Sequence, residues 1–466
     1  MPPAKWKYIK DPVHGLVKIS NEDLEIISTP LFQRLRNLHH MGTAFLTYPG
    51  ATHSRFEHSL GVAELGTSVF KNVICNSSGA NAAIWNNPDE RKKMEKTLRY
   101  ACLLHDIGHT PFSHTCEGFY SHEIDEIKAK ILSKLNFVTM DGESNEQVLI
   151  EKANHEIIGC YVILTEYREK LEGLGVNAES VAAMILGRVN KDVGNDLFKP
   201  YTILAQILNS PIDVDKFDYL LRDNYMTGSA LISLDKERLL STYTILDDIL
   251  VLSGKALSVI SNLIIGRQQV YMWVYQHHKV VYTNALLEKI LKRLIEDGKI
   301  KPDFFSVKNL IDNKIDDYDV ITQIRNNYDN PKIKNLYESW RERKFLKSPW
   351  KNAYDFRNKI DNEVSRSDLL TISKANPALL EQKIAETLRV DPDNVLVCWT
   401  KFVPYAEQQG LDIMIDIDGS PISAVATLRM STEGIKKYTE VPYVYVEEEK
   451  LPEILPYLQC YRRRAH

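Results

Sequence analysis

Cysteine is scarce in this sequence, and the few cysteines present are not arranged in pairs. The chain has six cysteines among 466 residues, widely scattered and without a Cys-X-X-Cys pair. This spacing argues against a disulfide framework and favours free thiols in a reducing compartment. The expected free thiols are Cys75, Cys102, Cys116, Cys160, Cys398 and Cys460.

Long apolar runs and an excess of basic charge are also missing. No stretch approaches the roughly 20 uninterrupted apolar residues that a membrane helix needs, and the N-terminal segment MPPAKWKYIKDPVHG lacks the apolar centre of a signal peptide. We therefore expect a soluble, cytoplasmic protein with no membrane partner. The net charge of -4 gives no global basic field, so binding to duplex nucleic acid is not expected.

Helical periodicity dominates the sequence from Asn21 to about Lys347. Segments such as FEHSLGVAELGTSVF and HEIIGCYVILTEYREKL repeat apolar residues at the spacing of one helical face. Four prolines stand where we expect helices to begin or end, because proline lacks the amide and blocks the preceding turn. These are Pro30, Pro111, Pro200 and Pro211.

The character of the sequence changes after about Pro349. The segments NVLVCWTKF, LDIMIDIDGSPISAVATLRM and VPYVYVEEE are rich in β-branched and aromatic residues, and Asp418-Gly419 has the composition of a hairpin turn. We predict a mainly α fold, with a multi-helix core over residues 1–348 and a smaller C-terminal α/β region over residues 349–466.

A polar, ionisable pair follows an apolar segment in the stretch ACLLHDIGHTPFSH. His105 and Asp106 come directly after four residues typical of a buried core. Burying ionisable groups is costly, and a metal ion is one of the few compensations available to such a pair. His58 lies on an earlier amphipathic segment and Asp215 on a later one. These four residues predict a site for one divalent cation with open coordination positions. The ligand set does not choose among Mn, Fe, Zn, Ni and Mg.

The order H…HD…D of these ligands resembles the HD superfamily of metal-dependent phosphohydrolases. The resemblance is closest to its deoxynucleoside triphosphate triphosphohydrolases, the branch that includes bacterial dNTPases and the mammalian SAM-and-HD-domain dNTPase. It is carried, in order, by DPVHG, TPLFQRLRNLHHMG, YPGATHSRFEHSLGV, HDIGHTPFSH, NHE and DVDKFDYLLRD. The resemblance implies an HD-domain core, hydrolysis of a dNTP to the deoxynucleoside and tripolyphosphate, and assembly as a homodimer or homotetramer.

The resemblance also implies a set of catalytic residues. His114 would face the α-phosphate and protonate the leaving 5'-oxygen, a role that suits an imidazole pKa near neutrality, and His109 would stand beside it. His155 and Glu156 match the catalytic His-Glu element of the family, in which the glutamate orients the imidazole. A competing pair stands at residues 122–123, and His155 is preferred because it opens an amphipathic helix.

A second set of residues is expected to bind the substrate. Asp215, Tyr219 and Asp223 are four residues apart and would form one stripe on a helix. By the resemblance, Tyr219 packs under the sugar, Asp223 accepts from the 3'-hydroxyl and Lys216 reaches a phosphate.

Two arginines and one further tyrosine complete the expected substrate contacts. Arg55 and Arg267 resemble phosphate-binding arginines of the family, because the guanidinium fork binds phosphate oxygens in pairs. Tyr275 would face the base. The assignment of Arg267 depends on aligning His277, rather than His278, with the family histidine.

The sequence departs from the family pattern at two positions. His40 stands where the mammalian enzyme has a glutamine near the sugar, which leaves selectivity for deoxyribose open. Ser28 replaces an aspartate that recognises guanine in an activating nucleotide, whereas Gln33 and Arg36 are retained. An allosteric site for an activating nucleotide at a subunit interface is therefore compatible with the sequence, but guanine specificity there is not supported.

Two other functions fit parts of the sequence. The H…HD…D site is indifferent to the group attached to the phosphate, so a nucleotidase or phosphodiesterase is an alternative. The basic segments KILKRLIEDGKIK and WRERKFLK would suit an oligomer that senses nucleotides or binds single-stranded nucleic acid.

Overall fold

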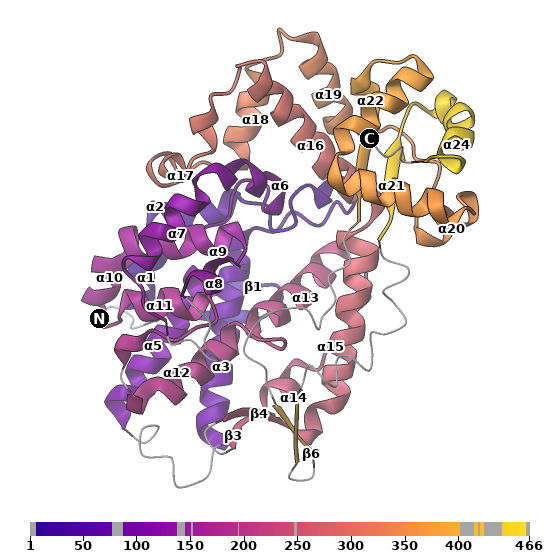
Figure 1. Cartoon of the computed structure of the whole chain (residues 1–466). Coiled ribbons are helices and arrows are strands. Elements are labelled where there is room, and N and C mark those ends of the chain that lie inside the picture. Colours follow the sequence, from indigo (N-terminus) through magenta and orange to yellow (C-terminus); the bar gives the residue numbers. More distant parts are fainter. Residues whose placement is uncertain are drawn as a thin grey trace.

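A computed structural model describes residues 6–76, 87–137, 145–150, 152–193, 195–246, 249–400, 414–417, 420–423 and 440–462. The chain is mainly α, with a few small sheets (Figure 1), and this confirms the predicted fold class. None of the helices in these ranges combines the length and the apolar character that a membrane span requires.

The described chain begins with a two-stranded hairpin. Strands β1 (Trp6–Asp11) and β2 (Gly15–Ser20) pair antiparallel, with Asp11 opposite Gly15 at the turn. Gly15 has a φ of +77°, a conformation that glycine adopts without steric cost. The buried side chains of Val17 and Ile19 hold the hairpin against the helical core.

Most helices of the first half pack into one apolar core. The long helices α3 and α5 contact each other, and α11, α12 and α13 pack on them. Their boundaries are α1 (Asn21–Ile27), α2 (Pro30–Arg34), α3 (Arg55–Asn76), α5 (Pro88–Leu104), α6 (His114–Glu117), α7 (Ile124–Leu132), α8 (Asn145–Ile150), α9 (Asn154–Val162), α10 (Arg168–Gly173), α11 (Ala178–Ile185), α12 (Asn195–Leu208) and α13 (Val214–Thr227).

Side-chain caps fix where α5 and α13 begin. Asn87 accepts hydrogen bonds from the backbone of residues 89 and 90 at the start of α5, and proline occupies the first helical position, as is favourable there. Asp213 accepts from the Lys216 amide at the start of α13. This cap sets the orientation of the first turn of α13, which carries Asp215.

The prolines do not all mark helix ends. Pro30 opens α2, and Pro211 lies between α12 and α13, as expected. Pro200 instead lies inside α12, so that prediction was wrong. The helix packs on α3 and α5, and this burial outweighs the one backbone hydrogen bond that proline cannot make.

The second half adds helices around the core and two small sheets. The helices are α14 (Lys236–Leu240), α15 (Leu257–Val270), α16 (His278–Glu296), α17 (Val307–Asn313), α18 (Asp317–Arg325), α19 (Pro331–Arg341), α20 (Ala353–Lys359), α21 (Glu363–Ala375), α22 (Pro377–Leu388) and α24 (Leu451–Gln459). The strands are β3 (Tyr243–Leu246), β4 (Ile249–Ser253), β5 (Leu396–Trp399), β6 (Met414–Ile417), β7 (Ser420–Ser423) and β8 (Pro442–Tyr445).

The strands expected after Pro349 are present, but they belong to two sheets. Strand β5 pairs antiparallel with β8, next to α21 and α22, whereas β6 and β7 extend the β3–β4 hairpin, with β4 and β6 parallel. Figure 1 shows α20 to α24 at one end of the molecule and β6 beside β3 and β4 at the other. Strands β6 and β7 are antiparallel, and the predicted turn at 418–419 between them lies outside the described residues. The division at residue 348 stays a prediction.

Candidate metal centre and active site

The four predicted metal ligands meet at one point. His58 comes from α3, His105 and Asp106 follow α5, and Asp215 lies in the first turn of α13. His58 Nε2 is 2.9 Å from Asp215 Oδ1 and 3.2 Å from His105 Nε2. His105 Nε2 is 3.4 Å from Asp106 Oδ1 and 3.5 Å from Asp215 Oδ1. The structure therefore brings the candidate ligands together from three segments of the chain, and their role in binding a metal stays a prediction.

The central pair lies at the end of a helix. The apolar run before the HD pair forms the end of α5, which stops at Leu104, and His105 is its C-terminal cap. The chain then turns, and His109 donates its amide to the Asp106 carbonyl at 3.0 Å. A turn, rather than a helix, directs His105 and Asp106 toward the same point.

The outer nitrogens of both imidazoles are already engaged. His58 Nδ1 is 2.7 Å from Asp218 Oδ2, and His105 Nδ1 is 2.8 Å from the Cys102 carbonyl oxygen. These contacts orient both Nε2 atoms toward the centre, which is the usual arrangement of metal-binding histidines. Two imidazole nitrogens with two carboxylates fit a divalent transition metal, so the residues present match the expected ion.

The charges at the centre favour a cation. Burial would raise the pKa of Asp106, but Arg55, His105 and His109 hold it well below its ordinary value. Burial would lower the pKa of His58, yet the carboxylates of Asp215 and Asp218 raise it to about 10. Positive charge is therefore stabilised at this point even though the residues are buried.

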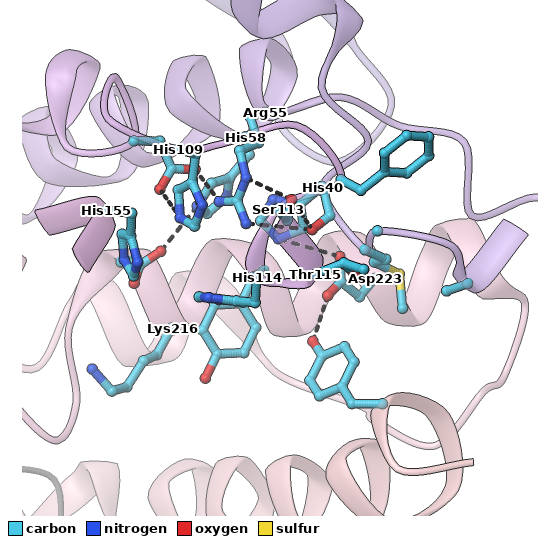
Figure 2. Close-up of a pocket in the computed structure, with 18 of the residues that line it drawn as sticks. His40, Arg55, His58, His109, Ser113, His114, Thr115, His155, Lys216 and Asp223 are labelled. Carbon is cyan, nitrogen blue, oxygen red and sulfur yellow. Dashed lines mark hydrogen bonds and ion pairs between the residues drawn. The ribbon is translucent and has the colours of Figure 1, made fainter. Parts of the chain in front are cut away.

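The candidate centre opens into a cavity of about 480 Å³, a size typical of small-molecule sites. In Figure 2 the side chains of His155 and Lys216 lie on the left of this cavity, His40 and Asp223 on the right, and His114 between them. Predicted site residues that line it are His40, Arg55, His58, His105, Asp106, His109, His114, His155, Glu156, Asp215, Lys216, Tyr219, Asp223 and Tyr275.

Three histidines gather beside the metal ligands. The rings of His109 and His155 stack with centroids 3.9 Å apart, and His109 Nε2 lies 3.3 Å from Asp106 Oδ1. The His114 ring packs edge-on against both, while 67% of its side chain is exposed. His114 thus faces the open cavity, where a ligand can reach it.

A strained turn presents His114. Phe112 and Ser113 have φ values of 51° and 55°, which are unfavourable for residues other than glycine. The Phe112 amide donates to Asp317 Oδ1 at 2.5 Å, and Ser113 Oγ accepts from Arg55 Nε at 2.9 Å. Contacts from two distant segments hold this conformation in place, as is common at functional sites.

The carboxylate that contacts His155 is Glu117, not the predicted Glu156. Glu117 Oε1 is 3.0 Å from His155 Nδ1, and its Oε2 is 2.8 Å from His114 Nδ1. Burial would raise the pKa of Glu117, but the two imidazoles hold it below its ordinary value. Glu156 instead accepts from the Ala153 amide at 3.0 Å and caps α9. The alternative pair at 122–123 does not line the cavity, in agreement with the preference for His155.

Asp223 forms the centre of the opposite wall. Its Oδ1 is 2.7 Å from His53 Nε2 and 3.8 Å from His40 Nε2, and its Oδ2 accepts from the Tyr275 hydroxyl. Burial, aided by the nearby His58 and Arg55, holds the pKa of His40 well below its ordinary value. Asp223 therefore has a neutral His40 and the Tyr275 hydroxyl among its neighbours on this wall.

The three predicted phosphate-binding cations all contact other residues of the chain. Arg55 Nη1 is 2.6 Å from Asp106 Oδ2, and Lys216 Nζ pairs with Asp213. Arg267 is 1% exposed and does not line the cavity. Its guanidinium lies 4.2 Å from the Tyr271 ring centroid. The structure thus brings Arg55 and Lys216 to the site but leaves Arg267 behind its wall.

The predicted regulatory residues lie outside the cavity. Gln33 donates to the Ile27 carbonyl at 2.7 Å and accepts from Arg36 Nε at 2.8 Å. The exposed Arg36 guanidinium lies 3.5 Å from the Phe56 ring centroid. Both residues are near the protein surface, next to the start of α3.

Several residues near the site were not identified from the sequence. Glu117 lies one helical turn after His114, and Tyr271 lies one turn before Tyr275 on the cavity wall. Their helical spacing from these two predicted site residues is the feature of the sequence that could have identified them. Four residues with buried side chains behind His58 had no assigned role, although two of them belong to the quoted DPVHG motif. These are Asp11, His14, Asp218 and Arg222.

Comparison with known proteins places this site in a family. The HD domain model matches residues 55–223, and the HD associated region model matches residues 234–436. An uncharacterized protein of Methanocaldococcus jannaschii is 27% identical over 93% of this chain and 74% of its own length. The deoxynucleoside triphosphate triphosphohydrolase SAMHD1 homolog of Dictyostelium discoideum is 29% identical over 64% of this chain and 50% of its own length.

Solved structures agree on the fold. A phosphohydrolase of Bacteroides thetaiotaomicron superposes with a TM-score of 0.63 at 21% identity, over 95% of this chain and all of that chain. The HD domain match begins at Arg55 and ends at Asp223, so it encloses all four candidate ligands. The chain therefore carries an HD domain, which encloses the candidate site, followed by an HD-associated region.

Proposed function

We propose that this protein hydrolyses deoxynucleoside triphosphates to the deoxynucleoside and tripolyphosphate, with one divalent metal ion held by His58, His105, Asp106 and Asp215. The observation that carries the proposal is the joint placement of two groups of residues in one cavity. The four candidate ligands lie at one side, and the stripe of Tyr219 and Asp223 continues away from Asp215 along α13. This arrangement gives room for a phosphate at the metal and a sugar beside it.

Each protein group has a task in this proposal. The bound metal would polarise the α-phosphoryl group and lower the pKa of a water molecule. His114, exposed to the cavity and oriented by Glu117, would donate the proton to the departing 5'-oxygen. Arg55 keeps the Asp106 carboxylate oriented. Tyr219 and Asp223 would support the sugar, with Asp223 accepting from the 3'-hydroxyl.

One observation favours the alternative function. Arg55 and Lys216 are paired with carboxylates, and Arg267 lies behind the wall. A triphosphate carries more negative charge than a monophosphate or a cyclic phosphate and needs more cationic partners. A nucleotidase or phosphodiesterase acting on a smaller phosphoester is therefore the second candidate. Under the first proposal, the triphosphate must draw Lys216 away from Asp213.

Product analysis separates the two functions. Metal-loaded protein is incubated with each dNTP, alone and in mixtures, and with nucleoside monophosphates and cyclic nucleotides. We expect deoxynucleoside and tripolyphosphate from dNTPs, and no product with Asp106→Ala. Release of orthophosphate or pyrophosphate from dNTPs would contradict the assigned bond. Activity confined to monophosphates or cyclic nucleotides would establish the alternative.

The resemblance also leads us to propose how the protein assembles and is regulated. Homodimers or homotetramers are expected, with a site for an activating nucleotide at Gln33 and Arg36. The dNTP mixtures serve as a test, because an activator would make the hydrolysis of one dNTP depend on the presence of another. Substituting Arg36 with alanine should then abolish this dependence without removing the metal.

A further inference from the structure

The turn of the N-terminal hairpin reaches the back of the candidate metal centre. His14 Nε2 lies 2.5 Å from Asp218 Oδ1, although the two residues are 204 positions apart in the sequence. Asp218 Oδ2 is in turn 2.7 Å from His58 Nδ1. A continuous path of hydrogen bonds therefore runs from the hairpin through one carboxylate to a candidate metal ligand.

Asp218 is held from three sides. Besides the two imidazoles, Arg222 donates to it twice, from Nε at 2.8 Å and from Nη2 at 3.0 Å. Neither Asp218 nor Arg222 has any exposed surface. A carboxylate with four donors in a closed space cannot rotate without losing hydrogen bonds. Its position, and thereby the direction of the His58 ring, is fixed by its partners.

The hairpin turn is fixed by the same network. Asp11 Oδ1 accepts from the amides of Val13 and His14 at 2.9 and 2.7 Å, and Asp11 Oδ2 accepts from Arg222 Nη1 at 2.8 Å. Arg222 thus joins the turn to α13, while β2 packs against α3. The DPVHG motif therefore does more than form a hairpin turn. Its Asp11 and His14 side chains connect the turn to Arg222 and Asp218 on α13.

The charge of this network also points toward a cation. Two buried carboxylates, Asp11 and Asp218, surround a single guanidinium, so these three groups alone have an excess of one negative charge, which a proton or a metal ion on the adjacent His58 can balance. A buried charge is stable only when it is balanced nearby. A metal ion on the far nitrogen of His58 would supply that balance through the imidazole, as in carboxylate–histidine–metal arrangements.

We propose that Asp218 and His14 are positioning residues of the metal centre: Asp218 directs Nε2 of His58 to the metal, and His14 fixes Asp218. The inference rests on the proposed function insofar as it assumes a metal at His58 and its partners. It goes further because it makes the N-terminal hairpin, which lies outside the matched HD domain, a part of that centre. Replacing His14 should weaken metal binding even though its side chain does not line the cavity.

The test measures Co²⁺ binding to the full chain, by competition with a chelator and by the absorption spectrum of the bound ion. The variants are His14→Ala, His14→Gln and Asp218→Asn, with Asp106→Ala to locate the site. His122→Ala is the matched control, because His122 is exposed and outside the cavity. Thermal unfolding of the metal-free proteins records any general loss of stability.

We expect His14→Ala and Asp218→Asn to weaken Co²⁺ affinity about 10- to 100-fold and to alter the Co²⁺ spectrum. His14→Gln, whose amide can still donate to Asp218, should recover part of the affinity, and His122→Ala should match the unaltered protein. If Asp218→Asn does not fold, the two His14 variants give the answer.

Two results would overturn the inference, and they are distinguishable. Unchanged Co²⁺ affinity and spectrum in the His14 variants, with binding abolished by Asp106→Ala, would reject the positioning role and leave the proposed function intact. Unchanged binding in Asp106→Ala would show that the metal is not at these residues, and both proposals would fail together.

Discussion

The carboxylate of Glu117 accepts a hydrogen bond from His155 Nδ1 at 3.0 Å. Its second oxygen accepts from His114 Nδ1, so one carboxylate orients both of these imidazoles. Glu117 belongs to the same short helix as His114, so the proposed proton donor and its orienting carboxylate lie on one element. The neighbouring Glu156 has its carboxylate at the N-terminus of α9 instead.

Glu117→Gln should therefore reduce turnover strongly. A glutamine retains the shape but cannot accept from two imidazoles, so the proton donor loses its fixed orientation. We expect kcat to fall about 100-fold with KM changed little, measured as release of product from the substrate that product analysis establishes. Glu156→Gln should lower kcat less, because the Glu156 carboxylate accepts from the Ala153 amide at the start of α9, whereas Glu117 contacts both imidazoles. A larger loss in Glu156→Gln would restore the assignment made from the sequence.

Gly61 lies where any larger residue would collide with Asp218. It is on α3 one turn after His58, and a Cβ there would stand 1.9 Å from Asp218 Oδ1. The Asp218 carboxylate cannot move aside without losing hydrogen bonds, because four donors hold it. Gly61→Ala should reduce the free energy of unfolding by about 2–4 kcal/mol, measured by urea denaturation, and should lower the amount of bound metal.

Gly118→Ala provides the matched control. A Cβ added to Gly118 would have no atom within 4 Å, and the residue has a φ of -61°, so an alanine fits there. Its free energy of unfolding should stay within about 0.5 kcal/mol of the original. Equal stability of the two variants would show that Asp218 can move.

The convergence of the four candidate ligands was predictable because each belongs to a distinctive short segment. The pair His105–Asp106 follows an apolar run, and His58 and Asp215 lie in segments of clear helical periodicity. A helix or tight turn fixes the direction of a side chain locally, so the segments needed only to pack together. The same reasoning identified the stripe of Tyr219 and Asp223, which lines the cavity.

The errors have physical causes in tertiary structure. Glu156 follows His155 directly, but consecutive side chains on a helix point about 100° apart, so the two do not meet. Glu117 comes from another helix and could be placed only by packing. Similarly, Arg267 lies on α15 eight residues before Tyr275, but the π-helical turn at Tyr271–Tyr275 changes which residues share a face.

Acid should destabilise the protein through His278. Burial, with the charges of His277 and two lysines, lowers the pKa of His278 from 6.5 to about 3. Between these values the unfolded chain binds a proton that the folded chain does not, so the stability falls as the pH drops below about 6.5. His278 is only partly buried, and after allowance for solvent screening we expect a loss of about 1 kcal/mol by pH 5.

His278→Gln should remove this part of the acid sensitivity. Urea denaturation of the original and the variant is compared at pH 7.5 and pH 5. Between these two pH values the free energy of unfolding of the variant should fall by about 1 kcal/mol less than that of the original. His122→Gln, at an exposed position, should follow the original. Parallel pH dependence of all three proteins would contradict a neutral His278.

Arg267 supports the cavity wall from behind. Its guanidinium lies 4.2 Å from the Tyr271 ring centroid and donates to the Tyr219 hydroxyl at 3.4 Å. These contacts hold two rings of the wall, and a lysine keeps the charge but not the flat surface. Arg267→Lys should therefore weaken binding of a deoxynucleoside several-fold and leave binding of tripolyphosphate unchanged, both measured by calorimetry.

Lys216→Gln should show the opposite pattern, because Lys216 lines the cavity and the proposed substrate needs its charge. Tripolyphosphate binding should weaken about tenfold, since a charge-assisted contact contributes roughly 1.5 kcal/mol, while deoxynucleoside binding is retained. If Arg267→Lys instead weakened tripolyphosphate binding alone, Arg267 would have to leave the wall and contact the phosphates. The two variants together thus distinguish the wall proposed to bind the sugar and base from the charges proposed to bind the phosphates.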